Sequence, residues 1–283
     1  MHLTTLSTYP VKSMRGIHLN SAPITPLGLP HDREWLLATP EGQFLTARKL
    51  PQLLLWQAHS LPNGLQLIAP NGESFTLEHH SLPHLAPVTV WKDQFLAYHG
   101  NTAADEWLSQ QLHTPCRLFW LGKTSQRILN YSQTPLSFAD GAPFLLTSEA
   151  SLHALNSRLD TPVEMARFRA NLVIDGTTPY AEESWKHIRI GEITFELFKP
   201  CTRCVMTTVD LHTAQKHPQQ QPLATLARTR RAIFGINMIA LNTGTLHIIT
   251  LFLSISPVFP FPNLIFKSIT GITIPLRFTT PNM

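Results

Sequence analysis

Short strand-like runs separated by turn signals fill the first 120 residues, and this pattern constrains the fold more than any other feature. Residues 33–47 form one such unit, with Pro40-Glu41-Gly42 at its turn. Residues 65–77 form a second, with Asn71-Gly72, the strongest short hairpin signal, at its centre. A further strand-like run follows at residues 88–91. The pattern predicts a small β-rich barrel or sandwich for this part of the chain.

Three helices are expected among the strands. Thr102 begins a Thr-x-x-Asp pattern that resembles a capping box. A second helix should run from Glu149 to about Leu159, capped by Thr147 or Ser148. A third should start at Pro222, because proline is favoured at the first helical position. The fold class predicted for the whole chain is therefore mostly β with a few helices (α+β).

The second half contains two segments that deliver polar side chains. An alternating pattern places Arg167, Arg169 and Asn171 on one face of a predicted strand. Arg169 stands among apolar residues, so it should be partly buried and needs an anionic partner. A hairpin through Gly191-Glu192 then leads the chain to Cys201.

Cys201 and Cys204 lie on either side of Arg203, a cationic setting that favours thiolate over thiol. The β-branched residues after Cys204 predict a strand, whereas a thioredoxin-like site places its cysteines at a helix N-terminus, so redox exchange is disfavoured. His212 and His217 could complete a zinc site, although the spacer of seven residues is shorter than the usual one of about twelve. Two packed strand cysteines, or a soft thiolate on a redox-active metal, are the other interpretations.

Composition limits the classes of partner. The net charge of +4 arises after Asp210, the last acidic residue, since the first 210 residues carry 16 basic and 18 acidic groups. No basic stripe interleaved with aromatic residues occurs, so nucleic-acid binding is not expected. Three cysteines and no signal-peptide pattern predict a cytoplasmic protein, with Cys116 as a packed strand residue.

Several motifs together resemble the MOSC domain proteins, in the branch of the bacterial YcbX type and the mitochondrial amidoxime-reducing component. In chain order they are Tyr9-Pro10-Val11-Lys12-Ser13, Asp32-Arg33, Thr46-Ala47-Arg48, Ser148-Glu149-Ala150-Ser151-Leu152, Phe168-Arg169-Ala170-Asn171, Cys201-Thr202-Arg203-Cys204 and Thr207-Thr208-Val209-Asp210. The resemblance implies an N-terminal MOSC β-barrel-like domain over residues 1–120 and a MOSC β-barrel domain over residues 121–246.

The resemblance also implies a molybdenum cofactor, with Cys204 as the metal ligand and Cys201 in support. The other residues expected to hold the cofactor are Lys12, Ser13, Arg33, Ser148, Arg169, Asn171 and Thr208, because arginine and lysine bind phosphate and Ser148 opens a helix. Asp210 is a candidate proton carrier.

Simpler roles remain open for four of these residues. Lys12 can be a solvated charge, and Asp32-Arg33 can be a local ion pair worth under about 1 kcal/mol. Ser148 can be only a helix cap, and Asp210 only a turn former.

The implied activity is a molybdenum-dependent reductase that removes oxygen from N-hydroxylated small molecules such as base analogues or amidoximes. The chain ends before any segment for a [2Fe–2S] cluster, so a separate reductase, expected to be a flavoprotein, would supply electrons. Two other classes compete: a sulfur carrier or cofactor-delivery module that works with a desulfurase using pyridoxal phosphate, and a non-catalytic product of a damaged gene.

The tail, residues 247–283, prompts the last class because it departs from the resemblance. It contains five prolines, no acidic residue, and only Lys267 and Arg277 as charges. The charge-free run 248–266 is long enough to span a membrane, but its prolines argue against a helix. The final barrel strand implied by the resemblance is missing, and we expect the tail after Leu246 to be foreign to the fold, for example an out-of-frame or replaced C-terminus. If the tail does not replace the missing strand, the barrel keeps an open edge that favours aggregation.

Overall fold

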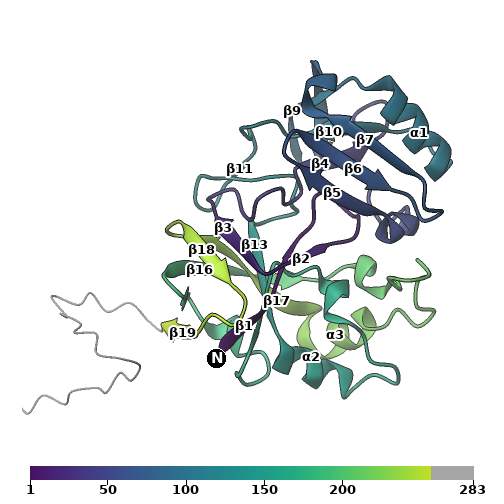
Figure 1. The fold of residues 1–283 in the computed structure, drawn as a ribbon. Helices are drawn as coiled ribbons and strands as arrows, with labels where there is room; N and C mark the ends of the chain where they lie inside the picture. The colour runs from purple at the N-terminus through teal and green to yellow at the C-terminus, as the bar shows by residue number, and fades with distance from the viewer. Residues whose placement is uncertain (256–283) are drawn as a thin grey trace, which may run out of the picture.

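A computed structural model describes residues 1–255, which form two β-rich parts, one above the other in Figure 1. Strands dominate and three α-helices accompany them in this range, which confirms the predicted fold class. The upper part contains a four-stranded sheet in the order β4-β10-β9-β8 and a three-stranded sheet in the order β5-β6-β7. The lower part contains an eight-stranded sheet in the order β19-β15-β16-β17-β13-β14-β1-β2.

The elements of the upper part are β4 (Trp35–Ala38), η1 (Pro51–Leu55), β5 (Gln57–Leu61), β6 (Gly64–Ile68), β7 (Ser74–Glu78), η2 (His79–Ser81), β8 (His84–Val90), β9 (Asp93–His99), α1 (Thr102–Leu112) and β10 (Arg117–Trp120). Both predicted hairpin units are confirmed: β6 pairs with β7 across Asn71-Gly72, and Ala38 bridges to Phe44. The predicted cap of α1 is wrong, because the Asn101 side chain accepts the Ala104 amide at 2.9 Å while Asp105 accepts the Leu118 amide.

The elements of the lower part are β1 (His2–Thr8), β2 (Ile17–Leu19), β3 (Ser21–Ile24), β13 (Phe144–Ser148), α2 (Glu149–Asn156), η3 (Met165–Phe168), β14 (Leu172–Asp175), η4 (Ala181–Ser184), β15 (His187–Ile190), β16 (Ile193–Thr202), η5 (Val205–Thr208), α3 (Leu223–Arg230), β17 (Ile233–Ala240), β18 (Gly244–His247) and β19 (Phe252–Ile255). β11 (Ile128–Leu129) and β12 (Thr134–Pro135) form a separate two-stranded sheet, and β11 lies beside the upper part in Figure 1. Helix α2 ends before the predicted Leu159, since the Asn156 amide bonds both backbone groups of Val163.

The first strands of the chain belong to the lower part, although they precede the upper part in sequence. β1 pairs with β14, and β3 pairs with β18, so residues 2–24 join strands from beyond residue 170. These pairings bury Leu3, Leu6 and Ile24 in the same core as strands β13 to β17. The loop after β1, which carries Lys12 and Ser13, is thereby placed where the two parts meet.

Residues 249–255 bond to β1 on one side and to β15 on the other, so the fold does not end at Leu246. The Ile249 amide donates to the Leu3 carbonyl at 2.7 Å, and the Leu3 amide donates to the Thr250 carbonyl at 3.0 Å. β19 pairs antiparallel with β15 on the other side. The expectation that the tail is foreign to the fold is therefore wrong for these residues, because their backbone groups supply the partners that would otherwise be missing at the edge. The rest of the predicted tail lies outside the described residues.

Candidate cofactor-binding cavity

A cavity of about 570 Å³ lies where the upper and lower parts meet, lined by residues from both. It brings together seven of the residues predicted from the sequence: Lys12, Ser13, Arg33, Arg169, Asn171, Cys201 and Cys204. Loops supply most of them, while Cys201 lies in the last residues of β16 and Cys204 follows two residues after its end. A scaffold of strands with functional groups at their ends is the usual way to build such a site.

Each cysteine of the motif receives a hydrogen bond from an arginine. The Arg203 Nη1 lies 2.8 Å from Cys201 Sγ, and the Arg48 Nε lies 3.2 Å from Cys204 Sγ. Both side chains are partly buried and neither cysteine is in a disulfide. The two arginines thus place hydrogen-bond donors beside two sulfur atoms, and sulfur is the ligand atom that soft metals prefer.

The strand predicted after Cys204 is wrong, because this segment is the short 3₁₀ helix η5. The Thr207 hydroxyl donates to the Cys204 carbonyl at 2.9 Å, and the Thr208 hydroxyl donates to the Val205 carbonyl at 2.8 Å. These local bonds satisfy the backbone without a neighbouring strand and outweigh the β preference of the sequence. Thr208 is fully buried, its hydroxyl proton is engaged in this turn, and it is not among the residues that line the cavity.

Positive charge dominates the cavity lining. Seven cationic side chains and one carboxylate line it: Lys12, Arg33, Arg48, Arg167, Arg169, Lys199, Arg203 and Asp140. Asp140 contacts the Lys12 ammonium, the Arg48 guanidinium and the Trp91 indole. Burial alone would raise the pKa of Asp140, but the charges of Lys12 and Arg48 lower it below its usual value. The excess of positive charge suits a ligand with several negative charges.

Lys12 is not the solvated charge that one interpretation allows, because its side chain is only 6% exposed. Its ammonium also donates to the Phe138 carbonyl at 2.7 Å. Burial lowers the pKa of Lys12 to about 8, and Asp140 partly offsets that effect.

Tyr9 lies between two guanidinium groups, each 4.2 Å from its ring centre, those of Arg33 and Arg169. Arg33 is held by Asp32 at 2.5 Å and by the Asn171 amide oxygen at 3.2 Å. Asp32 is 3% exposed and also accepts the Tyr9 amide at 2.9 Å, so this ion pair is buried rather than a local surface pair. The Asn171 side chain further bonds the backbone of Ser7 and Leu145, so it braces the loop after β1 as well as lining the cavity.

Arg169 follows η3 in the left-handed conformation, with φ of 54°, so the predicted alternating strand begins only at Leu172. One guanidinium nitrogen, Nη1, donates to the Met14 carbonyl at 2.5 Å. The other, Nη2, is buried and has no hydrogen-bond partner within residues 1–255. Burial and the nearby Arg33 lower the pKa of Arg169 to about 10. A buried cationic donor without a partner is the feature that a bound anion would satisfy.

Besides Thr208, two predicted residues do not line the cavity, Ser148 and Asp210. The Ser148 hydroxyl caps α2 by accepting the Ser151 amide at 3.1 Å, and its proton is engaged because it donates to the buried Glu182 carboxylate. Asp210 accepts the His212 amide at 2.9 Å and pairs with Arg167, so backbone and side-chain donors lower its pKa. A carboxylate held ionised in a turn is poorly suited to carry protons.

Three residues at the cavity were not selected from the sequence: Arg48, Trp91 and Asp140. Arg48 stacks on Trp91, 4.6 Å from its ring centre, while it bonds Cys204 and Asp140. The Thr46-Ala47-Arg48 motif was a usable signal for Arg48, whereas isolated Trp91 and Asp140 offered none. The zinc interpretation finds no support, because nowhere in the described range do three His, Cys, Asp or Glu side chains gather.

The fold and this cavity define a two-part β protein with cationic side chains and two thiols around a ligand-sized space. Residues 1–115 match the MOSC N-terminal beta barrel domain, and residues 133–249 match the MOSC domain. The chain belongs to the MOSC family.

Two relatives show the range of the family. The mitochondrial amidoxime-reducing component 1 of Mus musculus is 31% identical over 267 residues, which cover 85% of this chain and 78% of that protein. The molybdenum cofactor sulfurase of Oryza sativa is 34% identical over 264 residues, 83% of this chain but 32% of that protein. The chain therefore spans about a third of the sulfurase. A solved structure, the YUAD protein from Bacillus subtilis, matches with a TM-score of 0.45 and 9% identity, covering 89% of this chain and 93% of that one.

Within the part of the chain that the structure describes, no helix has the length and apolar character required to cross a membrane.

Proposed function

We propose that this chain binds a molybdenum cofactor in the cavity of about 570 Å³ and reduces N-hydroxylated small molecules to amines. The observation that carries the proposal is the combination, in one space, of two arginine-bonded thiols and an excess of cationic side chains. Thiolate suits a soft metal, and the cations suit the phosphate of a pterin cofactor.

The residues present fit this group at three points. The buried Arg169 Nη2 has no partner in the described range and offers a donor to an anion. Arg33, fixed by Asp32 and Asn171, adds a second planar donor near it. Cys204, held by Arg48, is the proposed metal ligand, and Cys201 is the supporting thiol.

When bound, the cofactor supplies two-electron chemistry that removes an oxygen atom from an N–O bond, and two electrons and two protons convert the hydroxylamine-type substrate to an amine and water. The chain itself must position substrate and supply protons. Lys12 holds a proton on Nζ inside the cavity, and with a pKa of about 8 it is the lining group placed to release one near neutral pH. Trp91, half exposed beside Arg48, offers an aromatic face for a planar substrate.

Electrons would come from a separate reductase, for which a flavoprotein is our proposal. The described residues contain three cysteines, one of them the buried Cys116, whose burial raises its pKa to about 11. Four cysteine ligands for an iron–sulfur cluster are thus not available in that range.

A second candidate function rests on the similarity to molybdenum cofactor sulfurase and on the partly buried thiol of Cys204. In that role, Cys204 would carry sulfur as a persulfide to a cofactor bound in the same cavity. Release of sulfur from purified protein by a thiol reductant, with no molybdenum bound, would favour the carrier over the reductase.

The first experiment measures molybdenum and released pterin in purified wild type, Cys204→Ala, Cys201→Ala and the core control Cys116→Ala. Near-stoichiometric molybdenum that is lost only in Cys204→Ala supports the assignment. Activity of the loaded protein on benzamidoxime with a chemical reductant then tests the reaction. Folded protein without molybdenum from cofactor-replete cells contradicts the proposal.

A further inference from the structure

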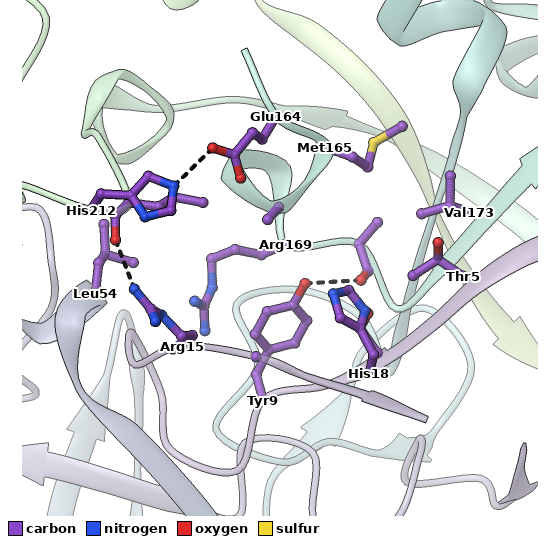
Figure 2. Close-up of a pocket in the computed structure, with 15 residues that line it drawn as sticks. Thr5, Tyr9, Arg15, His18, Leu54, Glu164, Met165, Arg169, Val173 and His212 are labelled. Atoms are coloured by element: carbon purple, nitrogen blue, oxygen red, sulfur yellow. Dashed lines mark hydrogen bonds and ion pairs between the residues drawn. The ribbon is translucent and has the colours of Figure 1, made fainter. Parts of the chain in front are cut away.

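A second cavity, of about 440 Å³, shares Arg169 with the first, and Figure 2 shows the residues that line it. It is formed by β1, the loop leading into β2, η3 and the loop after η5. Arg169 lines both cavities, whereas Arg15 lines only the second. The space is within the size range of small-molecule sites, and the proposed function assigns nothing to it.

Two guanidinium groups enter this second cavity without an acidic partner. Figure 2 shows the Arg15 and Arg169 side chains pointing toward one another. Within residues 1–255 neither forms an ion pair; Arg15 donates to the Leu211 carbonyl at 3.1 Å and Arg169 to the Met14 carbonyl. The one carboxylate in the lining, Glu164, bonds His212 at 3.0 Å instead. The cavity therefore has an unbalanced positive end.

The rest of the lining is largely apolar. Leu54, Met165 and Val173 contribute aliphatic walls, and the Tyr9 ring forms another side. The Tyr9 hydroxyl donates to the Ala170 carbonyl at 3.0 Å, so it is already satisfied. Gly16 permits this arrangement, because a Cβ there would lie 2.4 Å from the Tyr9 ring.

We propose that the second cavity binds a small organic carboxylate with an apolar body. Its carboxylate would accept hydrogen bonds from the planar guanidinium of Arg15. Arg169, whose Nη2 the proposed function assigns to the cofactor, would add its positive charge nearby. Its apolar body would lie against Tyr9 and the aliphatic walls. The proposal does not depend on molybdenum, because it uses side chains that the apoprotein already positions.

The test titrates the full chain with benzoate and with benzamide, a neutral molecule of the same shape, by calorimetry. We expect saturable benzoate binding and much weaker benzamide binding. Arg15→Gln should weaken benzoate roughly tenfold or more, since it removes a charged hydrogen bond. Arg15 is exposed, so the variant should fold, and unchanged melting of the variant checks this.

Two matched variants locate the bound probe. Arg189→Gln removes an exposed arginine on β15 that lines neither cavity, and Lys199→Gln removes a cation that lines only the first. Both should bind benzoate as the wild type does.

Loss of binding in Lys199→Gln but not Arg15→Gln would place the anion in the first cavity and overturn the proposal. Absence of saturable benzoate binding to the wild type would overturn it too. Inorganic phosphate binding as tightly as benzoate would refute the apolar part. Molybdenum content in Arg15→Gln should stay at the wild-type level, so failure here is separable from failure of the proposed function.

Discussion

Asp32→Asn should destabilise the protein far more than its place in an adjacent Asp-Arg pair suggests. The Asp32 carboxylate is 3% exposed and uses both oxygens: Oδ1 accepts the Tyr9 amide at 2.9 Å and Oδ2 accepts Arg33 Nη1 at 2.5 Å. An asparagine has only one acceptor oxygen, so one of these donors must lose its partner. The substitution also removes the negative charge beside two guanidinium groups that flank one tyrosine ring.

The expected loss follows from this burial. Removing one partner of a buried ion pair costs about 3 to 5 kcal/mol, compared with under about 1 kcal/mol for an exposed pair. For a chain of this length, about 3 kcal/mol lowers the melting temperature by about 6 °C or more. The matched control is Glu78→Gln, because Glu78 pairs with His80 at 3.0 Å while their side chains are 60% and 80% exposed. That variant should melt within about 2 °C of wild type.

Urea unfolding, followed by circular dichroism, gives the free energy, provided that the slope with denaturant stays constant. The double variant Asp32→Asn/Arg33→Gln separates pairing from packing. It should be less destabilised than the sum of the two single variants, because the uncompensated buried charge is gone. A loss below about 1 kcal/mol for Asp32→Asn, or strictly additive single effects, would refute the buried-pair interpretation.

Three further predictions follow from the structure. A chain ending at His247 should have a lower melting temperature and aggregate more than one ending at Ile255. It loses the backbone hydrogen bonds of residues 248–251 to Asn20, Leu3 and Gly191, and it exposes β1 and β15. Equal melting temperature and solubility would contradict the closure of the sheet by this segment. Gly16→Ala should destabilise by about 1 to 3 kcal/mol in urea unfolding, since its Cβ collides with the Tyr9 ring. Gly72→Ala, whose Cβ meets no atom but whose φ is positive, reports backbone strain alone, which Gly16→Ala does not add. Because the pKa of Lys12 is lowered to about 8, the unfolded chain binds more protons than the folded one between pH about 8 and 10.5, so this residue makes stability rise with pH across that window. The difference in unfolding free energy between wild type and Lys12→Met should therefore shift in favour of the wild type as the pH rises through it. A difference that does not depend on pH would contradict the burial of the charge.

The sequence predicted local structure where neighbouring residues decide it. The Asn71-Gly72 hairpin, the Ser148 cap of α2 and the turn at Gly191-Glu192 each depend on bonds within a few residues. The motifs also indicated that the segments carrying Lys12, Arg33, Arg169 and the cysteines act together. Their ordered resemblance to a family supplied what periodicity alone could not.

The predictions failed where side-chain hydrogen bonds or long-range partners outweighed the intrinsic preference of the residues. The β-branched residues after Cys204 form η5 because threonine hydroxyls satisfy the backbone there and no strand lies alongside. Ser148 donates a hydrogen bond to Glu182, which lies 34 positions away. Burial raises the pKa of this carboxyl group, and a buried polar group needs hydrogen-bond partners.

By itself, the sequence determined the fold class, the two hairpins and the three helices, and it supplied the candidate site residues. Only the tertiary structure decided which of these side chains share a cavity: Arg48 reaches Cys204 across 156 positions, and Lys12 reaches Asp140 across 128. It also decided that residues 249–255 close the sheet, between β1 at one end of the chain and β15 far along it. The physical reason is that such contacts depend on how strands pair over long separations, because buried backbone groups must find partners wherever the completed sheet offers them.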